Sequence, residues 1–165
     1  KQLAILKQTN NINLRLTIED LVAFGRFPYC KGNLTQTDRT FIDNAIAYMN
    51  LDDIRHQYID NLSGGQRQRA YIAMTLAQDT DYILLDEPLA GIDPIAVGEI
   101  RTLVSQLKNR GLGVLITDHN VRETLDIIDR AYILHGGTVL MEGTPDEIVA
   151  NEEVRKVYLG DNFSL

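Results

Sequence analysis

Two motifs, Leu62-Ser63-Gly64-Gly65-Gln66 and Tyr82-Ile83-Leu84-Leu85-Asp86-Glu87-Pro88, decide how this chain folds. In the first motif a serine precedes a glutamine by three residues, the spacing of a capping box at a helix start. A helix N-terminus with glycines offers bare N–H groups to a phosphate. The second motif is typical of a buried strand in a parallel sheet, and ligands bind beyond the carboxyl ends of such strands, where the two acids fall. A capped helix and a buried strand without a nucleotide role would give the same local pattern.

The two motifs together resemble a known family. Leu62 to Gln66 resembles the signature sequence of ABC-type ATPases, and Tyr82 to Glu87 resembles their Walker B strand with its catalytic glutamate. The resemblance implies an α/β fold of the P-loop NTPase type, with a mainly parallel sheet, surrounding helices and an inserted all-helical subdomain. It implies a Q-loop region over 1–16, a helical subdomain with the signature motif over 17–77, and the Walker B, D-loop, switch-histidine and C-terminal part over 78–165.

The resemblance implies an ATP hydrolase that uses ATP and Mg²⁺. Glu87 would be the general base that polarises the attacking water, and Asp86 would hold Mg²⁺, which prefers oxygen ligands. Gln8 follows the apolar run Leu3 to Leu6, as the Q-loop glutamine of the family follows its strand, and would contact Mg²⁺ and the water. His119 stands where the family has its switch histidine and would donate a hydrogen bond to the γ-phosphate. Taken alone, Gln8 would be read as a surface-loop residue.

The family also implies partners. Its nucleotide sites are shared by two domains, so the signature residues Ser63, Gly64, Gly65 and Gln66 would bind the γ-phosphate held by a second ABC ATPase domain in a head-to-tail dimer. Asp93, in a segment that resembles the D-loop, would help to couple the two sites, and it also reads as the N-cap of the next helix. Transmembrane permease subunits are the other expected partners. We therefore expect a cytoplasmic protein, peripheral on the cytoplasmic face of the bacterial inner membrane.

The composition limits the other classes of function. The chain has 165 residues, 44% of them hydrophobic, and a net charge of −7. This balance argues against a dedicated nucleic-acid binder, whose footprint is basic. The single cysteine, Cys30, excludes an internal disulfide and gives no support to a Cys and His metal site. No apolar run approaches the ~20 residues that span a membrane.

One element of the family is missing from the sequence. No Gly-x-x-x-x-Gly-Lys-Ser/Thr phosphate cradle occurs in the chain. We expect the cradle to lie before Lys1, and we expect the chain alone to be inactive as an ATPase. The alternative is a non-catalytic truncated or engineered ABC-domain fragment that acts only as a binding or assembly module. A soluble ABC ATPase of DNA repair or translation is a weaker reading, because the compact chain has no long insertion or tandem domain.

The two parts of the chain resemble different branches of the family. Residues 1–88 resemble the iron–siderophore importer ATPases, most specifically at Gly25-Arg26-Phe27-Pro28-Tyr29. Residues 90–165 resemble the ATPases of lipopolysaccharide export, for example from Leu115 to Leu125. The sequence therefore suggests a recombinant or designed chimera with a seam near Pro88 to Ala90. Because a permease selects the cargo, the sequence leaves open which substrate is moved and whether transport is import or export.

Overall fold

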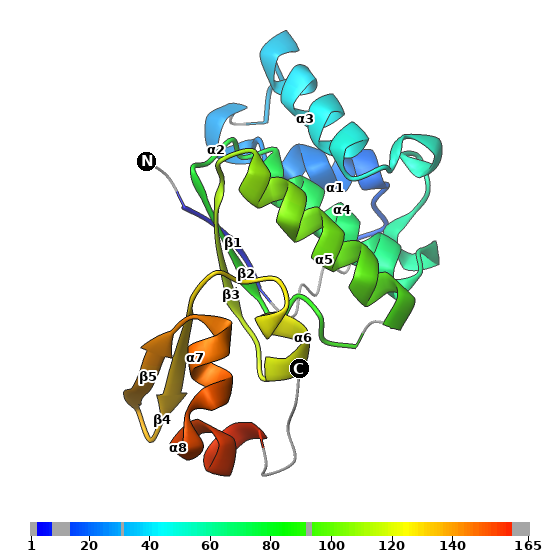
Figure 1. The fold of residues 1–165 in the computed structure, drawn as a ribbon. Helices are drawn as coiled ribbons and strands as arrows, with labels where there is room; N and C mark the ends of the chain where they lie inside the picture. The colour runs from blue at the N-terminus through cyan, green and yellow to red at the C-terminus, as the bar shows by residue number, and fades with distance from the viewer. Residues whose placement is uncertain (1–2, 8–13, 31, 92–93, 160–165) are drawn as a thin grey trace. The chain divides into compact units, whose positions relative to one another are not determined.

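The computed structural model describes residues 3–7, 14–30, 32–91 and 94–159 (Figure 1). The chain divides into two compact units, Lys1–Thr117 and Asp118–Leu165, and each is described by itself. Within the described residues, none of the helices combines the length and the apolar character that crossing a membrane requires.

The first unit is built on a parallel sheet of three strands. Strands β1 (Leu3–Leu6), β2 (Tyr82–Asp86) and β3 (Gly113–Thr117) lie in the order β1-β2-β3. The register pairs Leu6 with Leu85 and Leu85 with Ile116, so all three strands end at the same edge of the sheet. The expected α/β fold with a mainly parallel sheet is confirmed for this unit.

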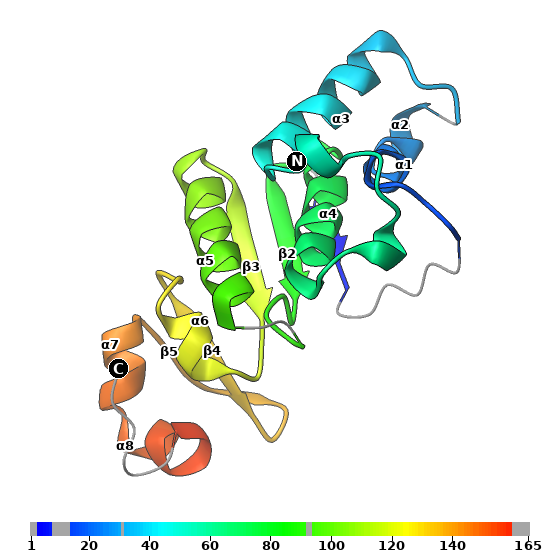
Figure 2. The same ribbon diagram turned by 90° about the vertical axis from the view of Figure 1, so that its right-hand side faces the viewer.

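Two helices cover one face of this sheet. Helices α4 (Gly64–Leu76) and α5 (Pro94–Asn109) pack against β1 and β3, as Figures 1 and 2 show. The strand side chains that face them are buried: Ala4, Leu6, Ile83 and Leu85. The opposite face keeps large apolar side chains about half exposed: Leu3, Ile5, Tyr82 and Leu115. Among the described residues no further strand pairs with the outer edges of β1 and β3.

The expected helical insert lies between β1 and β2. It contains α1 (Ile18–Phe24), α2 (Phe27–Cys30), α3 (Gln36–Tyr48), the 3-10 turns Asp52–Ile54 and Ile59–Asn61, and α4. A capping box of Thr17 and Asp20 starts α1. The long helix α3 is capped by Thr35, because Asp38 three residues later completes the capping box.

Within the insert, the segment after α1 packs against the end of α4. Gly25 approaches the backbone so closely that an added Cβ would lie 2.1 Å from the carbonyl oxygen of Met74. The buried side chain of Arg26 donates to the carbonyl of Ala77, which ends α4, at 2.8 Å. The hydroxyl of Tyr29 donates to the carbonyl of Gln78 at 2.7 Å. This stretch, which resembles the importer branch, therefore has a packing role in the first unit.

The second unit holds a β-hairpin with helices on one face. Strands β4 (Ala131–His135) and β5 (Thr138–Gly143) are antiparallel and joined by Gly136 and Gly137, both at positive φ, as a two-residue hairpin requires. The other elements are α6 (Val121–Leu125), α7 (Pro145–Ala150), α8 (Glu152–Val154) and a π-helical turn, Arg155–Leu159. Four buried apolar side chains form the core: Leu125, Ile133, Ile148 and Val154.

Candidate functional site

The signature segment forms the capped start of α4. Ser63 has extended backbone angles, and its hydroxyl accepts a hydrogen bond from the amide of Gln66 at 3.2 Å. The side-chain oxygen of Gln66 accepts from the amide of Ser63 at 3.0 Å. The predicted capping box is thus present. Ser63 and Gly64 are exposed, whereas Gly65 is buried.

This arrangement leaves the helix start open to an anion. The first N–H groups of a helix have no intrahelical acceptor, and the helix dipole favours negative charge there. Glycine at the first two positions of α4 places no side chain over these groups. The exposed helix start at Gly64 is therefore suited to a phosphate, while the Ser63 and Gln66 side chains hold the turn in shape.

The two acids lie at the carboxyl end of β2 and are both partly buried. Asp86 is the last residue of β2, and its Oδ1 accepts a hydrogen bond from the hydroxyl of Thr117 at 2.5 Å. Glu87 follows, and its amide donates to the carbonyl of Thr117 at 2.7 Å. The structure thus brings Asp86 and Glu87 together with the last residue of the neighbouring strand β3.

Glu87 has an uncommon backbone conformation. Its φ of 47° lies in the left-handed region, which residues other than glycine enter at a cost of order 1–3 kcal/mol. Such conformations persist where the surrounding structure determines them, and they concentrate at active sites. The amide hydrogen bond to β3 is one such restraint. The chain therefore turns sharply directly after Asp86, at the edge where ligands of parallel sheets bind.

His119 lies in the second unit, directly before α6. Its side chain is 76% exposed, and its Nδ1 lies 3.8 Å from Oδ1 of Asp118. The Asp118 side chain is only 1% exposed, and its Oδ1 accepts from the amide of Asn120 at 2.8 Å. Its Oδ2 has no hydrogen-bond partner among the described residues. The sequence analysis gave no role to Asp118, whose carboxylate lies beside the imidazole of His119.

Two predicted site residues, Gln8 and Asp93, lie outside the described residues. Their proposed roles therefore stay predictions.

Thr117, beside Asp86 and Glu87 at the carboxyl end of β2, is the residue that sequence analysis missed. A polar residue at the end of an apolar strand was the available signal, since Gly113 to Ile116 carry no polar side chain.

The carboxyl end of β2, where Asp86 and Glu87 lie, offers oxygen atoms that can bind a metal ion. The carboxylates of Asp86 and Glu87 lie at the same strand end as the Thr117 hydroxyl, and Mg²⁺ prefers oxygen ligands. In the part of the chain that the structure describes, no three His, Cys, Asp or Glu side chains are grouped to hold a metal ion. This fits Mg²⁺, which is usually held by one or two carboxylates and completed by waters and substrate phosphates.

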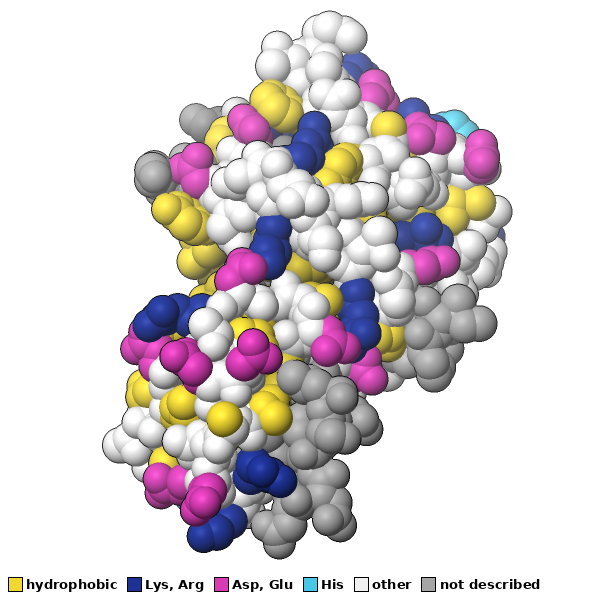
Figure 3. Space-filling view, in the orientation of Figure 1, with side chains coloured by type: hydrophobic (Ala, Val, Ile, Leu, Met, Phe, Trp, Pro, Cys, Tyr) yellow, Lys and Arg dark blue, Asp and Glu magenta, His cyan; other side chains and the backbone are white. Residues whose placement is uncertain are grey.

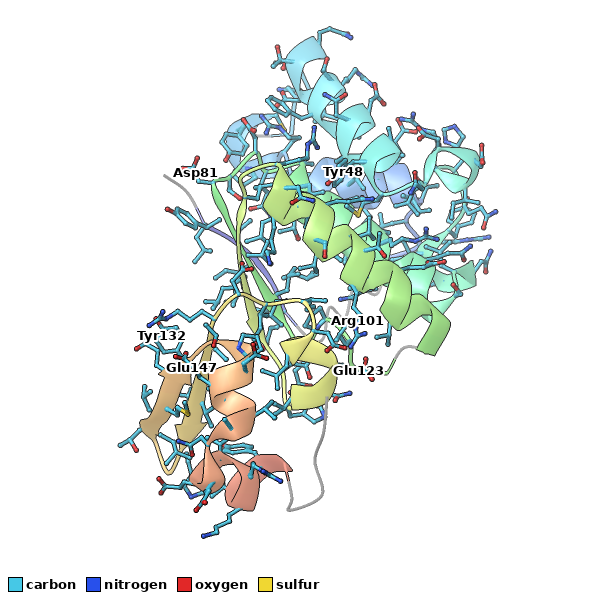
Figure 4. The ribbon with its side chains drawn as sticks, viewed as in Figure 1. Tyr48, Asp81, Arg101, Glu123, Tyr132 and Glu147 are labelled. Carbon is cyan, nitrogen blue, oxygen red and sulfur yellow. The ribbon has the colours of Figure 1, made fainter. Side chains whose placement is uncertain are left out.

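A cavity of about 300 Å³ lies elsewhere in the first unit and is not lined by any predicted site residue. It is bounded by α3, the amino end of β2 and the turn before β3. The ring of Tyr48, which is labelled in Figure 4 and ends α3, lies 4.5 Å beneath the guanidinium of Arg110. Because Asp79, Thr80 and Ile83 line it, the cavity lies at the opposite end of β2 from the acids.

The charged side chains visible in Figure 3 are of both signs and interspersed.

Comparison with known proteins agrees with this geometry. The model of the ABC transporter family matches residues 1–90, more than half of the chain, and the model of a branched-chain amino acid ATP-binding cassette transporter matches residues 138–164. The chain is 46% identical over 159 residues to the petrobactin import ATP-binding protein YclP of Bacillus subtilis. It is 47% identical over 161 residues to the lipopolysaccharide export system ATP-binding protein LptB of Haemophilus influenzae.

These matches cover 96% and 97% of the chain, but 63% and 66% of the two relatives, so the chain spans about two thirds of their length. Both relatives match nearly the whole chain at similar identity. The chimera therefore stays a hypothesis, as does the position of a phosphate cradle before Lys1.

Solved structures show the same fold. A putative metal-chelate type ABC transporter in an inward-facing conformation matches 94% of the chain with a TM-score of 0.87 at 23% identity, and the chain covers 63% of it. The cbiO1 protein of Clostridium perfringens, part of the ABC transporter complex cbiONQ, matches 95% of the chain with a TM-score of 0.80 at 29% identity, again with 63% covered. The chain belongs to the family of ABC transporter ATP-binding proteins.

Proposed function

We propose that this chain is part of an ATP-hydrolysing subunit that couples ATP hydrolysis to transport across a membrane. The observation that carries the proposal is the pair of partly buried acids at the carboxyl end of β2, with Thr117 hydrogen-bonded to both residues. Phosphoryl transfer to water requires an oriented water and neutralised phosphate charge. Two adjacent carboxylates at a ligand-binding strand end are suited to these two tasks.

The two acids take different roles in this proposal. Glu87 accepts a proton from the attacking water as general base, from a left-handed backbone position directly after β2. Asp86 binds Mg²⁺, which when bound neutralises phosphate charge. His119 donates a hydrogen bond to the γ-phosphate from its exposed imidazole. Gln8 contacts Mg²⁺ and the water.

The start of α4 serves a second domain in this proposal. Ser63 to Gln66 bind the γ-phosphate held by another ABC ATPase domain in a head-to-tail dimer. The exposed start of α4 at Gly64 supports this role, since a helix N-terminus suits an anion that approaches from outside the chain. Asp93 helps to couple the two sites. Permease subunits are the membrane partners, and the protein is peripheral on the cytoplasmic face of the inner membrane.

The cargo is proposed at the level of two classes. YclP is named for petrobactin import and LptB for lipopolysaccharide export, and the chain resembles both to a similar degree. Iron–siderophore import and lipopolysaccharide export are therefore the two candidate transport types. Reconstitution with each type of permease, followed by measurement of stimulated ATP turnover, separates them.

The proposal is tested in a polypeptide that supplies a Gly-x-x-x-x-Gly-Lys-Ser/Thr cradle in front of these 165 residues. Glu87→Gln is expected to lower turnover by about 10²–10⁴-fold, the usual contribution of a general base, while nucleotide-dependent dimerisation persists. Glu152→Gln, at the exposed start of α8, is the matched control and should leave turnover unchanged. Turnover retained in Glu87→Gln would rule out Glu87 as the base.

The second candidate is a binding or assembly module without catalysis. Such a module would keep only the contacts with a second ABC domain or with a permease. ATP turnover of the 165-residue chain alone should then be indistinguishable from that of its Glu87→Gln variant. A clear turnover that depends on Glu87 would exclude the module and support the enzyme.

A further inference from the structure

Thr117 contacts both residues of the acid pair through two different groups. Its hydroxyl donates to Oδ1 of Asp86 at 2.5 Å, and its carbonyl accepts from the amide of Glu87 at 2.7 Å. The β2–β3 register places Thr117 directly opposite Asp86. We propose that Thr117 is a positioning residue that fixes the metal-binding carboxylate through its side chain and the base through its backbone.

The hydroxyl contact determines which carboxylate oxygen is available. The Thr117 hydroxyl binds Oδ1 of Asp86, which leaves Oδ2 as the other oxygen of the carboxylate. A carboxylate held at one oxygen keeps its orientation and offers the other oxygen to a cation or to the waters around it. Side chains that orient a ligating carboxylate in this way typically change metal affinity 10–100-fold when they are replaced.

The neighbours of Thr117 make its hydroxyl distinctive. On this face β3 presents Gly113, Leu115 and Thr117, of which Thr117 alone carries a polar side chain. Leu115 is 57% exposed and Thr117 is also exposed, so the hydroxyl is not required to satisfy a buried partner. As a β-branched residue in a strand, threonine has a restricted χ1, which keeps the hydroxyl directed at Asp86. Valine has the same shape without the donor.

The backbone contact supplies a separate restraint on Glu87. Because this contact uses the carbonyl of Thr117, it persists when the side chain is replaced. Side-chain variants therefore change the orientation of Asp86 and leave the left-handed turn at Glu87 intact. This separation lets one set of variants test the metal-binding carboxylate by itself.

The inference rests on the proposed function and is tested in the same cradle-bearing polypeptide. We expect Thr117→Val to weaken Mn²⁺ affinity about 10–100-fold, measured by electron paramagnetic resonance with bound nucleotide, and to raise the Mg²⁺ concentration for half-maximal turnover. Nucleotide affinity without metal should not change. Thr117→Ser keeps the hydroxyl and should stay within about threefold of the parent. Thr102→Val, whose hydroxyl donates to the carbonyl of Gly98 within α5, is the matched control.

The outcomes separate this inference from the proposed function. If Thr117→Val and Thr117→Ser bind Mn²⁺ like the parent, the positioning role is refuted. Equal losses in both variants refute it as well, because the hydroxyl is then not the cause. If Thr117→Val does not fold, Thr117→Ala removes the same donor with less bulk. Turnover that survives Glu87→Gln would overturn the proposed function, and the Mn²⁺ titration would still decide the role of Thr117.

Discussion

Replacing Arg26 by methionine is expected to destabilise the first unit strongly. The guanidinium is enclosed by four contacts. Nε lies 2.9 Å from Oδ1 of Asp38, and Nη1 donates to the carbonyl of Ala77 at 2.8 Å. The rings of Tyr29 and Phe41 lie 4.3 and 4.4 Å from the central carbon of the guanidinium. Methionine keeps an unbranched apolar stem but removes the charge and both donors.

The size of the expected destabilisation follows from these contacts. Each hydrogen bond of a charged group contributes about 1.5–3 kcal/mol, and each cation–π contact contributes about 0.5–2 kcal/mol. Desolvation of the guanidinium, whose side chain is 7% exposed, offsets part of this gain. Removal of one member of a buried ion pair usually costs about 3–5 kcal/mol, and we expect Arg26→Met to fall in this range. That is a large part of the ~5–15 kcal/mol that stabilises a typical protein.

Urea unfolding followed by circular dichroism measures the loss in the free energy of unfolding. Hydrogen exchange at the last turn of α4 shows whether this region is the part that is destabilised. Arg15→Met is the matched control, because Arg15 is exposed and lies 4.3 Å over the ring of Tyr58. The control should lose less than about 1 kcal/mol, as exposed cation–π contacts do. If the two variants lose the same free energy of unfolding, the enclosed guanidinium does not contribute strongly to the packing of the segment after α1 against α4.

Two further predictions concern the same region. Hydrogen bonds from the side chain and the backbone of Thr35 hold the pKa of Asp38 at about 2, below its ordinary 3.8. The stabilisation is therefore complete above about pH 4 and is lost as the pH falls through 2; urea titrations from pH 5 to 2 should show this loss, and Asp38→Asn should abolish it. Gly25→Ala should cost about 1–3 kcal/mol because its Cβ meets the Met74 carbonyl, whereas Gly98→Ala, with open space around it in α5, should gain about 0.5–1 kcal/mol in thermal unfolding. Equal effects of the two alanines would contradict the close approach at Gly25.

Features encoded over three or four residues were predictable from the sequence. The capping box at Ser63 forms as expected, and capping boxes also start α1 at Thr17 and α7 at Thr144, because each cap and its partner lie three residues apart in the chain. The hairpin at Gly136 and Gly137 is equally local, since two glycines readily take the positive φ of such a turn.

Other features depend on residues that are distant in sequence. The contact of Arg26 with Ala77 spans 51 residues, and the contact of Thr117 with Asp86 spans 31. Neither has a periodic signature, because each follows from how separate elements pack. The end of α6 at Leu125 is of the same kind, since the Leu125 side chain enters the core of the second unit.

The two motifs that organise the chain differ in the same way: one is shaped by neighbouring residues and the other by a contact with a distant strand. The start of α4 is shaped by Ser63 and Gln66 themselves, so its capped form requires little beyond the helix. The carboxyl end of β2 is held by a neighbouring strand, since Asp86 and Glu87 both form a hydrogen bond with Thr117 of β3. Any change that shifts β3 against β2 by one residue would place a different side chain opposite Asp86 and remove the hydroxyl contact. The orientation of the metal-binding carboxylate is therefore a property of strand register, whereas the anion-binding helix start is a property of local sequence.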